Sequence, residues 1–492
     1  MASQTHFVLI PFLSQGHIIP MIDIAKLLAQ RNVIVTIFTT PLNAARNLSL
    51  DRAVRSGLPI HVVTVPFPAT EAGLPEGCES VEILPLPSLT RNFVRALDML
   101  HQPVELLFRK LTPSPSCLIA DKTIPWTADL ASKFHIPRLI FDGTSCFTAL
   151  CSHNLHVSKV YETAHNSEPF LVPGLPDQIE FTRAQLPGYF NPGQHLDLKE
   201  FRDKVRATEA EAYGNLINSF EELEVDYVKA YKRVRGDKVW TVGPVSLCNT
   251  EELDKAQRGN KASTDENLCL KWLDSQEAGS VIYACLGSLN RMTPTQLVEL
   301  GLALEASNRP FIWVIRGGHK KEEMDKWIIE SGYEERVKGR SFLIRGWAPQ
   351  VLILSHQAIG GFLTHCGWNS TLEGICAGLP MVTWPIFAEQ FYNEKLVVQL
   401  LDIGVRVGAE VVVHIGDEDK HGVLVKWKQI RDAIDEVMSQ EKEGEKRRER
   451  AMKLSKMAKK AVEAGGSSHL NINLLIDDIM QHIRDNHIKA WQ

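Results

Sequence analysis

Short apolar segments alternate with segments of helical periodicity along this chain, and this alternation is the strongest constraint on its fold. Residues 6–12 (HFVLIPF) form a continuous apolar run, which is typical of a parallel strand buried on both faces. Residues 18–31 have helical periodicity, and residues 33–40 (VIVTIFTT) form the next apolar segment. A strand, a helix and a strand in succession predict a βαβ unit. We therefore expect an α/β fold with parallel sheets.

The alternation occurs twice, and a polar, proline-bearing stretch at residues 240–266 separates the two runs. Because 492 residues exceed the size of one ordinary domain, two domains are expected. We predict a Rossmann-like N-terminal domain at residues 1–243, a linker at 244–270, a second Rossmann-like domain at 271–465 and a terminal helix at 466–492.

Composition and charge exclude several classes of protein. The net charge of −5 argues against a nucleic-acid partner, and the basic run at residues 441–460 is interpreted as a solvated helix face because acidic residues interrupt it. No segment has the pattern of a membrane-spanning helix or of a secretory signal. The nine cysteines are scattered, without CxxC spacing, which indicates reduced thiols. We expect a cytoplasmic monomer, with association with the endoplasmic reticulum surface as an alternative location.

Residues 347–390 place polar and aromatic side chains around a predicted anion site. Residues 360–365 (GGFLTH) are expected to form a buried strand, residues 366–370 a turn and residues 371–379 a helix. The N-terminus of a helix favours phosphate, because its first N–H groups are unpaired and the helix dipole is positive there. His365 and Ser370 flank this predicted site and could add donors.

Other residues of the same stretch suit the remaining parts of a sugar nucleotide. Glu373 is expected to accept hydrogen bonds from ribose hydroxyls, and Trp347 offers a flat surface for a base. Glu389 and Gln390 have the acceptor and donor groups that sugar hydroxyls require. The small Cys366 in the turn is interpreted as a buried side chain and not as a nucleophile.

This stretch closely resembles the plant secondary-product glycosyltransferase signature box of the family 1 UDP-dependent glycosyltransferases. The match includes Trp-Ala-Pro-Gln at 347–350, His-Cys-Gly-Trp-Asn-Ser at 365–370 and Glu-Gln at 389–390. Residues 11–31, 218–224 and 465–479 are similar to further segments of the same family. The resemblance implies the GT-B arrangement, in which two Rossmann-like domains face each other across a cleft and the final helix crosses back onto the N-terminal domain.

The resemblance also implies an inverting hexosyltransferase that moves a sugar from a UDP-sugar to a hydroxyl of a small lipophilic plant metabolite. Gln390 is associated in this family with glucose, and UDP-galactose or UDP-glucuronic acid are the alternative donors. The N-terminal stretch is similar to a subgroup that acts on flavonoids, triterpenoids and steroids. The residues implied for the UDP-sugar site are Ser288, Trp347, Ala348, Gln350, His365, Gly367, Trp368, Asn369, Ser370, Glu373, Glu389 and Gln390.

His17 and Asp121 are the candidate catalytic residues. Each directly follows or ends a predicted strand, and open α/β sheets bind ligands at the carboxyl ends of their strands. A histidine at a helix N-terminus is biased towards the neutral form that a general base needs, and a carboxylate on its other nitrogen would fix the tautomer. The family resemblance implies these two roles. Lys122 departs from the family pattern beside Asp121.

No metal or other cofactor is expected, since the helix N-terminus and His365 would stabilise the diphosphate. Asp417, Glu418 and Asp419 match the Asp-x-Asp pattern of metal-dependent transferases, but their polar surroundings favour a solvated loop. The acceptor pocket is expected from residues 83–93, 144–150 and 181–190, with aromatic walls from Phe93, Phe147, Phe181, Tyr189 and Phe190.

Two other functions remain as alternatives. A nicotinamide-dependent oxidoreductase would need a Gly-x-Gly-x-x-Gly turn after the first strand, where this chain has Leu-Ser-Gln-Gly-His. A non-catalytic protein that binds sugar nucleotides would not need both His17 and Asp121.

Overall fold

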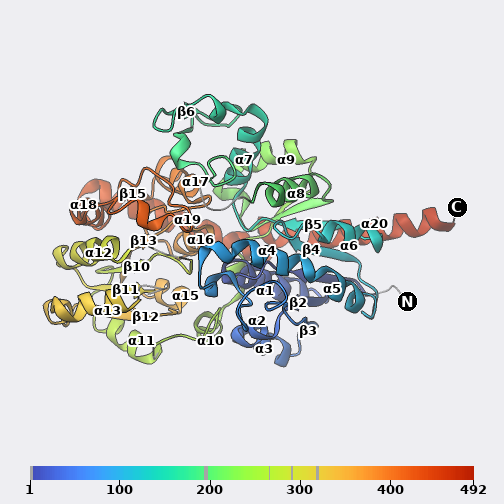
Figure 1. Cartoon of the computed structure of the whole chain (residues 1–492), viewed down its shortest axis with the longest axis horizontal. Helices are drawn as coiled ribbons and strands as arrows, with labels where there is room; N and C mark the ends of the chain where they lie inside the picture. Colours follow the sequence, from blue (N-terminus) through green and yellow to red (C-terminus); the bar gives the residue numbers. More distant parts are fainter. Residues whose placement is uncertain (1–3, 193–197, 265, 290–291, 317–320, 492) are drawn as a thin grey trace.

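The computed structural model describes residues 4–192, 198–264, 266–289, 292–316 and 321–491. Within these residues, two open parallel sheets lie side by side, each with helices on both faces (Figure 1). The N-terminal half occupies the right of this view and most of the C-terminal half the left. This arrangement confirms the predicted α/β fold with two Rossmann-like halves.

The N-terminal sheet has the strand order β3-β2-β1-β4-β5-β8-β9, and every pairing described within it is parallel. Its strands are β1 (His6–Ile10), β2 (Ile34–Thr39), β3 (Ile60–Thr64), β4 (Cys117–Asp121), β5 (Arg138–Phe141), β8 (Gly214–Ile217) and β9 (Val239–Thr241). A separate hairpin pairs β6 (Phe170–Leu171) with β7 (Glu180–Phe181).

The C-terminal sheet has the order β12-β11-β10-β13-β14-β15 and is also parallel. Its strands are β10 (Val281–Cys285), β11 (Phe311–Ile315), β12 (Ser341–Arg345), β13 (Ile359–Thr364), β14 (Met381–Thr383) and β15 (Gly404–Arg406).

Both sheets reverse their strand order near the middle, and ligands of open α/β sheets bind in the crevice at such a reversal. In the N-terminal sheet the reversal lies between β1 and β4, and in the C-terminal sheet it lies between β10 and β13. His17 follows β1 and Asp121 ends β4, while His365 follows β13. The candidate residues are therefore grouped at the two reversal points.

Helices cover the sheets because successive side chains of each strand face opposite sides. Phe7 and Leu9 of β1 belong to one apolar cluster, and Val8 and Ile10 belong to another. The N-terminal helices are α1 (Gln15–Ala29), α2 (Pro41–Arg46), α3 (Leu48–Arg55), α4 (Thr90–Met99), α5 (His101–Phe108), α6 (Thr127–Lys133), α7 (Cys146–Ser158), α8 (Lys199–Ala210) and α9 (Val225–Arg235).

The later helices surround the second sheet and then return to the first. They are α10 (Glu252–Ala256), α11 (Glu266–Asp274), α12 (Pro294–Ala306), α13 (Lys321–Glu330), α14 (Tyr333–Arg336), α15 (Gln350–Leu354), α16 (Trp368–Ala377), α17 (Gln390–Lys395), α18 (Trp427–Val437), α19 (Lys442–Val462) and α20 (Ser467–Trp491). No helix in the described parts of the chain is long and apolar enough to cross a membrane.

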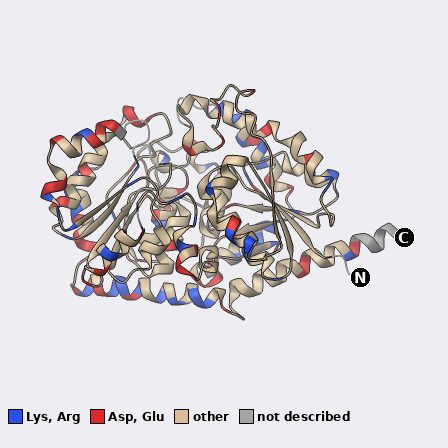
Figure 2. Cartoon of the chain, turned by 90° about the horizontal axis from the view of Figure 1, so that it is seen from below, with Lys and Arg blue, Asp and Glu red and all other residues tan. Residues whose placement is uncertain are grey.

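The last helix, α20, packs against the N-terminal sheet. Its Ile472, Leu475 and Ile479 are buried in the same cluster as Phe7 and Leu9, and α20 contacts β9. The preceding helix α19 contains the basic run, and its ribbon, with basic and acidic positions interspersed, runs along the outer edge of the molecule (Figure 2). The proposed domain boundaries remain predictions.

Two details differ from the sequence-based expectation. Helix α16 begins at Trp368, earlier than the expected residue 371, because Gly367 serves as its N-cap. The segment at 244–270 is not a free polar connection, since it contains the short helix α10 and buries Ala256 and Arg258. A polar composition did not reveal this burial, because Arg258 is buried through ion pairs.

Candidate functional site

His17 and Asp121 form a hydrogen-bonded pair at the reversal point of the N-terminal sheet. Nδ1 of His17 lies 2.6 Å from Oδ2 of Asp121. The His17 side chain is 35% exposed and that of Asp121 only 1%. The other carboxylate oxygen accepts hydrogen bonds from the backbone N–H and the hydroxyl of Thr123, at 2.9 and 2.6 Å. Asp121 is thus held from one side and directed at His17 from the other.

The charges of this pair stabilise each other. Burial lowers the pKa of His17, but the Asp121 carboxylate, together with Glu389 and Glu82, more than offsets this, so the pKa of His17 lies above its ordinary value. Burial raises the pKa of Asp121, and the opposing effects of His17 and Thr123 bring it below its ordinary value. The expected bias of His17 towards the neutral form is therefore outweighed by its carboxylate partner. An ionised Asp121 favours the tautomer with the proton on Nδ1, which leaves Nε2 of His17 as the basic nitrogen.

Lys122, which lies beside this pair, has a partner of its own. Its ammonium group forms an ion pair with the buried carboxylate of Asp142, which follows β5. Burial lowers the pKa of Lys122, but Asp142 and other nearby carboxylates raise it by more, so the net shift is upward. The positive charge that Lys122 adds next to Asp121 is thus paired with the Asp142 carboxylate at the end of a neighbouring strand.

The N-terminus of α16 forms the centre of the predicted diphosphate site. His365 lies at the end of β13, and a Cβ atom on Gly287 would come within 2.4 Å of its Nε2 atom. Gly287 also has a φ of +80°, so both conformation and space favour glycine there. Burial and then the charge of Arg316 lower the pKa of His365 to about 4. His365 is therefore neutral near pH 7, so it can serve the diphosphate as a hydrogen-bond donor, as expected from the sequence, and not as a cation.

Cys366, in the same turn, is fully buried with a φ of +62°. Burial raises the pKa of its thiol well above the ordinary value, and a protonated thiol is a poor nucleophile. Its interpretation as a small buried side chain is confirmed.

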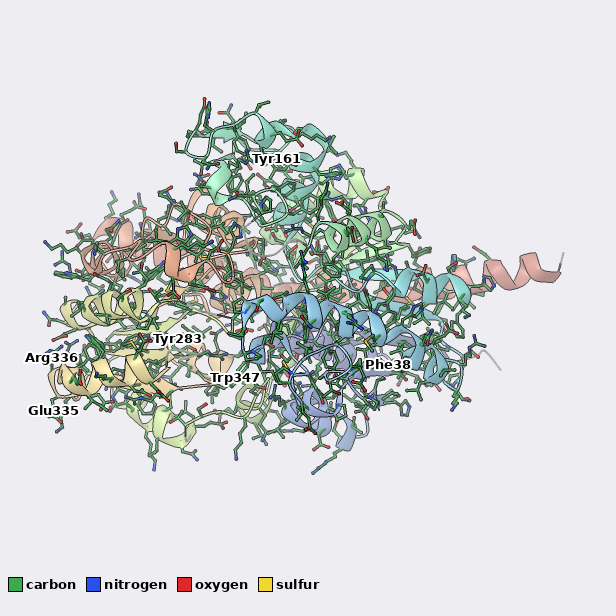
Figure 3. The ribbon with its side chains drawn as sticks, viewed as in Figure 1. Phe38, Tyr161, Tyr283, Glu335, Arg336 and Trp347 are labelled. Atoms are coloured by element: carbon green, nitrogen blue, oxygen red, sulfur yellow. The ribbon has the colours of Figure 1, made fainter. Side chains whose placement is uncertain are left out.

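The residues expected to bind the nucleoside lie beside α16. Gln350 donates to Ser370 Oγ at 3.0 Å and to Glu373 Oε2 at 2.8 Å. Trp347 lies where the two halves meet (Figure 3), and the Arg316 guanidinium carbon is 4.5 Å from the centroid of its ring. Ala348 is buried next to it.

Trp368 and Asn369 contact the N-terminal half through their side chains. Nε1 of Trp368 donates to the Asn218 carbonyl at 2.7 Å, and Nδ2 of Asn369 donates to the Gly16 carbonyl at 2.6 Å. These contacts bring the N-terminus of α16 against the first turn of α1. The predicted diphosphate site and the predicted base are therefore adjacent. The assignment of Trp368 and Asn369 to the UDP-sugar site, which includes their backbone N–H groups, remains a prediction.

Glu389 and Gln390 lie at the start of α17. Burial raises the pKa of Glu389, while the charges of Lys122 and His17 oppose that shift, so this carboxylate lies within electrostatic reach of the base. Oε1 of Gln390 accepts hydrogen bonds from the backbone N–H groups of Ile386 and Phe387, at 2.8 and 3.1 Å. The side-chain carbonyl of Gln390 is therefore occupied by the preceding turn, and its side-chain NH₂ group is left to donate to a sugar hydroxyl. Ser288 is half-buried after β10, and it does not cap α12, whose N-cap is Thr293.

Phe12 and the buried Phe93 belong to an aromatic cluster next to the base. The Phe12 ring centroid lies 5.2 Å from that of His17 and 6.0 Å from that of Phe93, and Phe67 packs on Phe93 at 5.4 Å. Sequence reasoning found Phe93 but missed Phe12 and Phe67, although Phe12 directly ends the first apolar run. The other expected aromatic residues are Phe147, Phe181 and Phe190, which are buried in an interior cluster, and Tyr189, which packs against it.

A cavity of ≈ 450 Å³ opens beside the N-terminus of α1. Its lining combines N-terminal residues with two linker residues, and comprises Gln15, Ala45, Arg46, Leu48, Ser80, Glu82, Ile83, Asn260 and Lys261. Glu82 Oε1 accepts hydrogen bonds from Ser14 Oγ and from the backbone N–H of Gln15, both at 2.6 Å. The cavity is partly polar, and its lining residue Gln15 precedes His17 by two positions in the sequence.

The Asp-x-Asp pattern lies in a locally paired turn. Asp417 forms an ion pair with Lys420 at 2.8 Å, and Glu418 accepts from the Gly416 N–H at 2.9 Å. Within the described residues, no group of three His, Cys, Asp or Glu side chains is placed to hold a metal ion. The absence of a metal requirement remains a prediction.

Comparisons with known proteins agree with this geometry. Residues 234–462 match the family model described as UDP-glucoronosyl and UDP-glucosyl transferase. UDP-glycosyltransferase 73C11 of Barbarea vulgaris is 52% identical over 485 residues, which cover 98% of this chain and 97% of that protein.

Solved structures extend the similarity to three dimensions. UGT73P12 of Glycyrrhiza uralensis, complexed with glycyrrhetinic acid 3-O-monoglucuronide, has a TM-score of 0.90 and 38% identity, with 99% of each chain covered. UGT89C1 of Arabidopsis thaliana, complexed with UDP-L-rhamnose, has a TM-score of 0.73 and 29% identity, with 97% of this chain and 99% of that chain covered.

Proposed function

Because the chain belongs to the plant family of UDP-dependent glycosyltransferases, we propose that it transfers glucose from UDP-glucose to a hydroxyl of a triterpenoid or flavonoid. Glycosyl transfer itself follows from the family. The donor sugar, the acceptor and the stereochemistry are the parts that we propose. UDP-galactose and UDP-glucuronic acid remain the alternative donors.

The observation that carries the mechanism is the hydrogen bond of 2.6 Å between His17 and Asp121. Nε2 of His17 removes the proton from the acceptor hydroxyl, whose oxygen attacks the anomeric carbon. The positive charge that His17 gains is stabilised by the Asp121 carboxylate. One displacement inverts the anomeric carbon, so an α-linked donor gives a β-glycoside.

The departing UDP gains negative charge next to α16. The first N–H groups of this helix and the neutral His365 can donate hydrogen bonds to the diphosphate. Glu373 would accept from the ribose hydroxyls, and Trp347 would stack with uracil. We propose that these groups suffice without a metal ion.

Glucose is supported by Gln390, the residue that the family associates with this sugar. A lipophilic acceptor is supported by the aromatic cluster of Phe12, Phe93 and Phe67 beside His17, in which Phe12 and Phe67 are partly exposed. The triterpenoid class is supported by UGT73P12, whose structure holds glycyrrhetinic acid 3-O-monoglucuronide. The unpaired cysteines suit the cytoplasm, where thiols stay reduced.

A mass-spectrometric transfer assay tests this proposal. Purified protein is given UDP-glucose, UDP-galactose or UDP-glucuronic acid separately, with a mixed pool of triterpenoids, flavonoids and sterols and with a chelator present. We expect a product heavier by one hexose with UDP-glucose. The control His17→Ala should bind UDP but form no product.

The other outcomes are equally informative. Product from only one of the alternative donors would overturn the assignment of glucose. Activity that needs added divalent cation would overturn the metal-independent mechanism. UDP binding without any product, together with equal behaviour of His17→Ala, would favour the non-catalytic alternative.

A further inference from the structure

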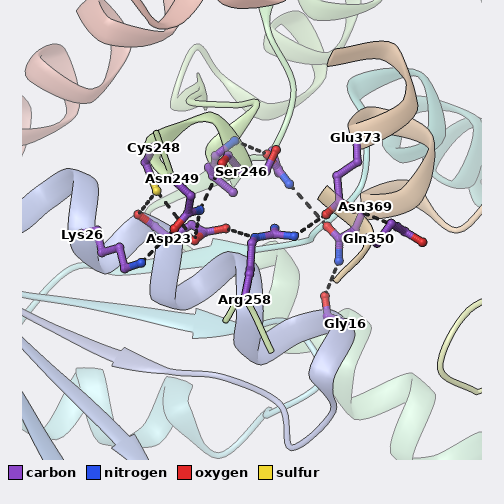
Figure 4. Close-up of polar contacts among 12 residues, drawn as sticks. Gly16, Asp23, Lys26, Ser246, Cys248, Asn249, Arg258, Gln350, Asn369 and Glu373 are labelled. Carbon is purple, nitrogen blue, oxygen red and sulfur yellow. Dashed lines mark hydrogen bonds and ion pairs between the residues drawn. The ribbon is translucent and has the colours of Figure 1, made fainter. Parts of the chain in front are cut away.

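Arg258 lies in the segment between α10 and α11, and its guanidinium group bridges two buried carboxylates. Its Nε atom lies 2.8 Å from Asp23 Oδ2, and its Nη1 atom forms an ion pair with Glu373 Oε1 (Figure 4). The side chain of Arg258 is 7% exposed, that of Asp23 1% and that of Glu373 6%. Burial of charges at this depth is costly unless they are paired and hydrogen-bonded, so this arrangement is a specific contact.

The two carboxylates belong to different halves of the molecule. Asp23 lies on α1, the helix whose first turn carries His17, and Glu373 lies on α16, whose N-terminus forms the predicted diphosphate site. Arg258 belongs to neither sheet, and it connects α1, which carries His17, with α16, which forms the predicted diphosphate site.

The surrounding polar groups complete this contact. Lys26 donates to Asn249 Oδ1 at 2.9 Å, and Asn249 donates to Asp23 Oδ1 at 2.8 Å. Two cations, Arg258 and Lys26, thus accompany two carboxylates, so the buried cluster is close to neutral overall. Its specificity comes from the planar fork of Arg258, whose N–H groups point in directions that a lysine cannot reproduce.

Arg258 also determines how Glu373 is presented. Oε1 of Glu373 is held by Arg258, and Oε2 accepts from Gln350 at 2.8 Å. An ionised carboxylate has about four acceptor positions, so both oxygens can still accept from a ribose hydroxyl. The carboxylate is thereby fixed in one orientation before a donor binds.

The residues after Arg258 border the predicted base platform. A Cβ atom on Gly259, whose φ is +100°, would come within 2.3 Å of Cζ2 of Trp347. Oγ of Ser263 accepts from the Trp347 backbone N–H at 2.6 Å, and the Ser263 N–H donates to the Trp347 carbonyl at 2.9 Å. One short stretch of the linker therefore contacts both residues that we assign to the nucleoside.

We propose that Arg258 is a positioning residue for donor binding: it orients Glu373 for the ribose hydroxyls and ties this carboxylate to Asp23 on the helix of the base. The inference rests on the proposed function, because the ribose contact of Glu373 belongs to that proposal. It adds the linker to the donor site as a third component beside the two sheets.

The test compares the binding of UDP with that of 2′-deoxy-UDP, measured by titration calorimetry. In the unaltered protein we expect UDP to bind about 10- to 100-fold more tightly, the range of one hydrogen bond to a charged group. In Arg258→Lys this ratio should fall below about 3-fold, because the fork that orients Glu373 is lost. Loss of folding alone would weaken both ligands and leave their ratio unchanged.

Kinetics give a second readout. For Arg258→Lys we expect a higher KM for UDP-glucose, an unchanged KM for the acceptor and a smaller change in kcat at saturating donor. Arg406→Lys is the matched control. Arg406 forms an ion pair with the buried Glu394 at 2.9 Å in the same half, and its replacement should leave the UDP to 2′-deoxy-UDP ratio as it was.

A further pair of variants separates this inference from the proposed function. If Glu373→Gln leaves the binding ratio unchanged, the ribose assignment is wrong and the role of Arg258 falls with it. If Glu373→Gln removes the preference for UDP over 2′-deoxy-UDP but Arg258→Lys preserves it, only the inference about Arg258 is overturned. Should Arg258→Lys fail to fold, the double variant Asp23→Asn/Arg258→Met decides, because it removes one charge of each sign. The same loss of ratio would support the proposal, and an intact ratio would overturn it.

Discussion

Replacing Asp121 by asparagine preserves the size of this side chain but changes what it offers to His17. The backbone N–H and hydroxyl of Thr123 both donate to Oδ1 of Asp121. In Asp121→Asn these donors attract the amide oxygen, so the NH₂ group is turned towards Nδ1 of His17. His17 must then accept at Nδ1 and carry its proton on Nε2, the nitrogen that should act as the base.

Two contributions set the size of the effect. A unit-charge pair about 4 Å apart is worth about 4 kcal/mol at an effective dielectric constant of about 20. Since the His17 side chain is 35% exposed, solvent screening reduces this to about 2 kcal/mol. The wrong tautomer adds about 1–2 kcal/mol, the scale of one hydrogen bond. A total of about 3–4 kcal/mol corresponds to a fall in kcat of roughly 100- to 1000-fold.

The assay is the pH dependence of glucosyl transfer at saturating donor and acceptor. Asp121 holds the pKa of His17 above its ordinary value, and His17 must be neutral to act as a base. Activity of the unaltered protein should therefore decline as the pH falls through that raised pKa. In Asp121→Asn the decline should move to lower pH, in addition to the lower maximal rate, while UDP affinity stays the same.

Two further variants make this reasoning refutable. Glu394→Gln removes a buried carboxylate of the other half that pairs with Arg406, and it should leave the acidic limb in place. Thr123→Val in the Asp121→Asn background removes one of the donors that orient the amide, so it should restore part of the rate. A normal rate for Asp121→Asn, or an acidic limb that does not move, would refute the proposed role of Asp121.

Other outcomes follow from the donor site. His365, whose pKa is lowered to about 4, should bind a proton more readily beside a diphosphate, so UDP-glucose should bind more tightly as the pH falls from about 7 to about 5. Calorimetry in buffers of different ionisation enthalpy would detect the proton uptake. An affinity that does not depend on pH would contradict this prediction. Gly287→Ala should weaken UDP binding by about 1–3 kcal/mol, because its positive φ is strained for alanine and its Cβ would displace His365; unchanged affinity would show that the imidazole position is irrelevant. All cysteines except Cys248 are buried, so iodoacetamide at neutral pH should leave transfer activity intact, as intact-mass analysis and the assay would show; rapid inactivation would contradict this burial.

The fold could be predicted largely because its strands are buried on both faces. Runs such as residues 6–12 have few polar residues, since helices cover both sides of the sheet. The start of α16 was less predictable, because its periodic apolar positions begin after the first turn, whereas Gly367 already caps the helix at Trp368. Element boundaries depend on such local caps more than on periodicity.

The candidate site could be predicted where function depends on residues close to a strand end. His17, Asp121 and His365 are placed by β1, β4 and β13. Partners that depend on tertiary contact were not accessible in this way. The pairing of Arg258 with Asp23 and Glu373 joins three distant parts of the chain, and the Gln390 carbonyl is occupied by a turn that only the folded backbone defines.

The docking of α20 on the first sheet has a consequence for how the chain folds during synthesis. Ile472, Leu475 and Ile479 complete the apolar layer over Phe7 and Leu9, yet they are synthesised long after the first strand. At about 5–20 residues per second, the first strand waits roughly 25 to 90 seconds for this cover. During that interval the nascent chain exposes an apolar surface that chaperones can recognise, so the docking of α20 closes this layer late in folding.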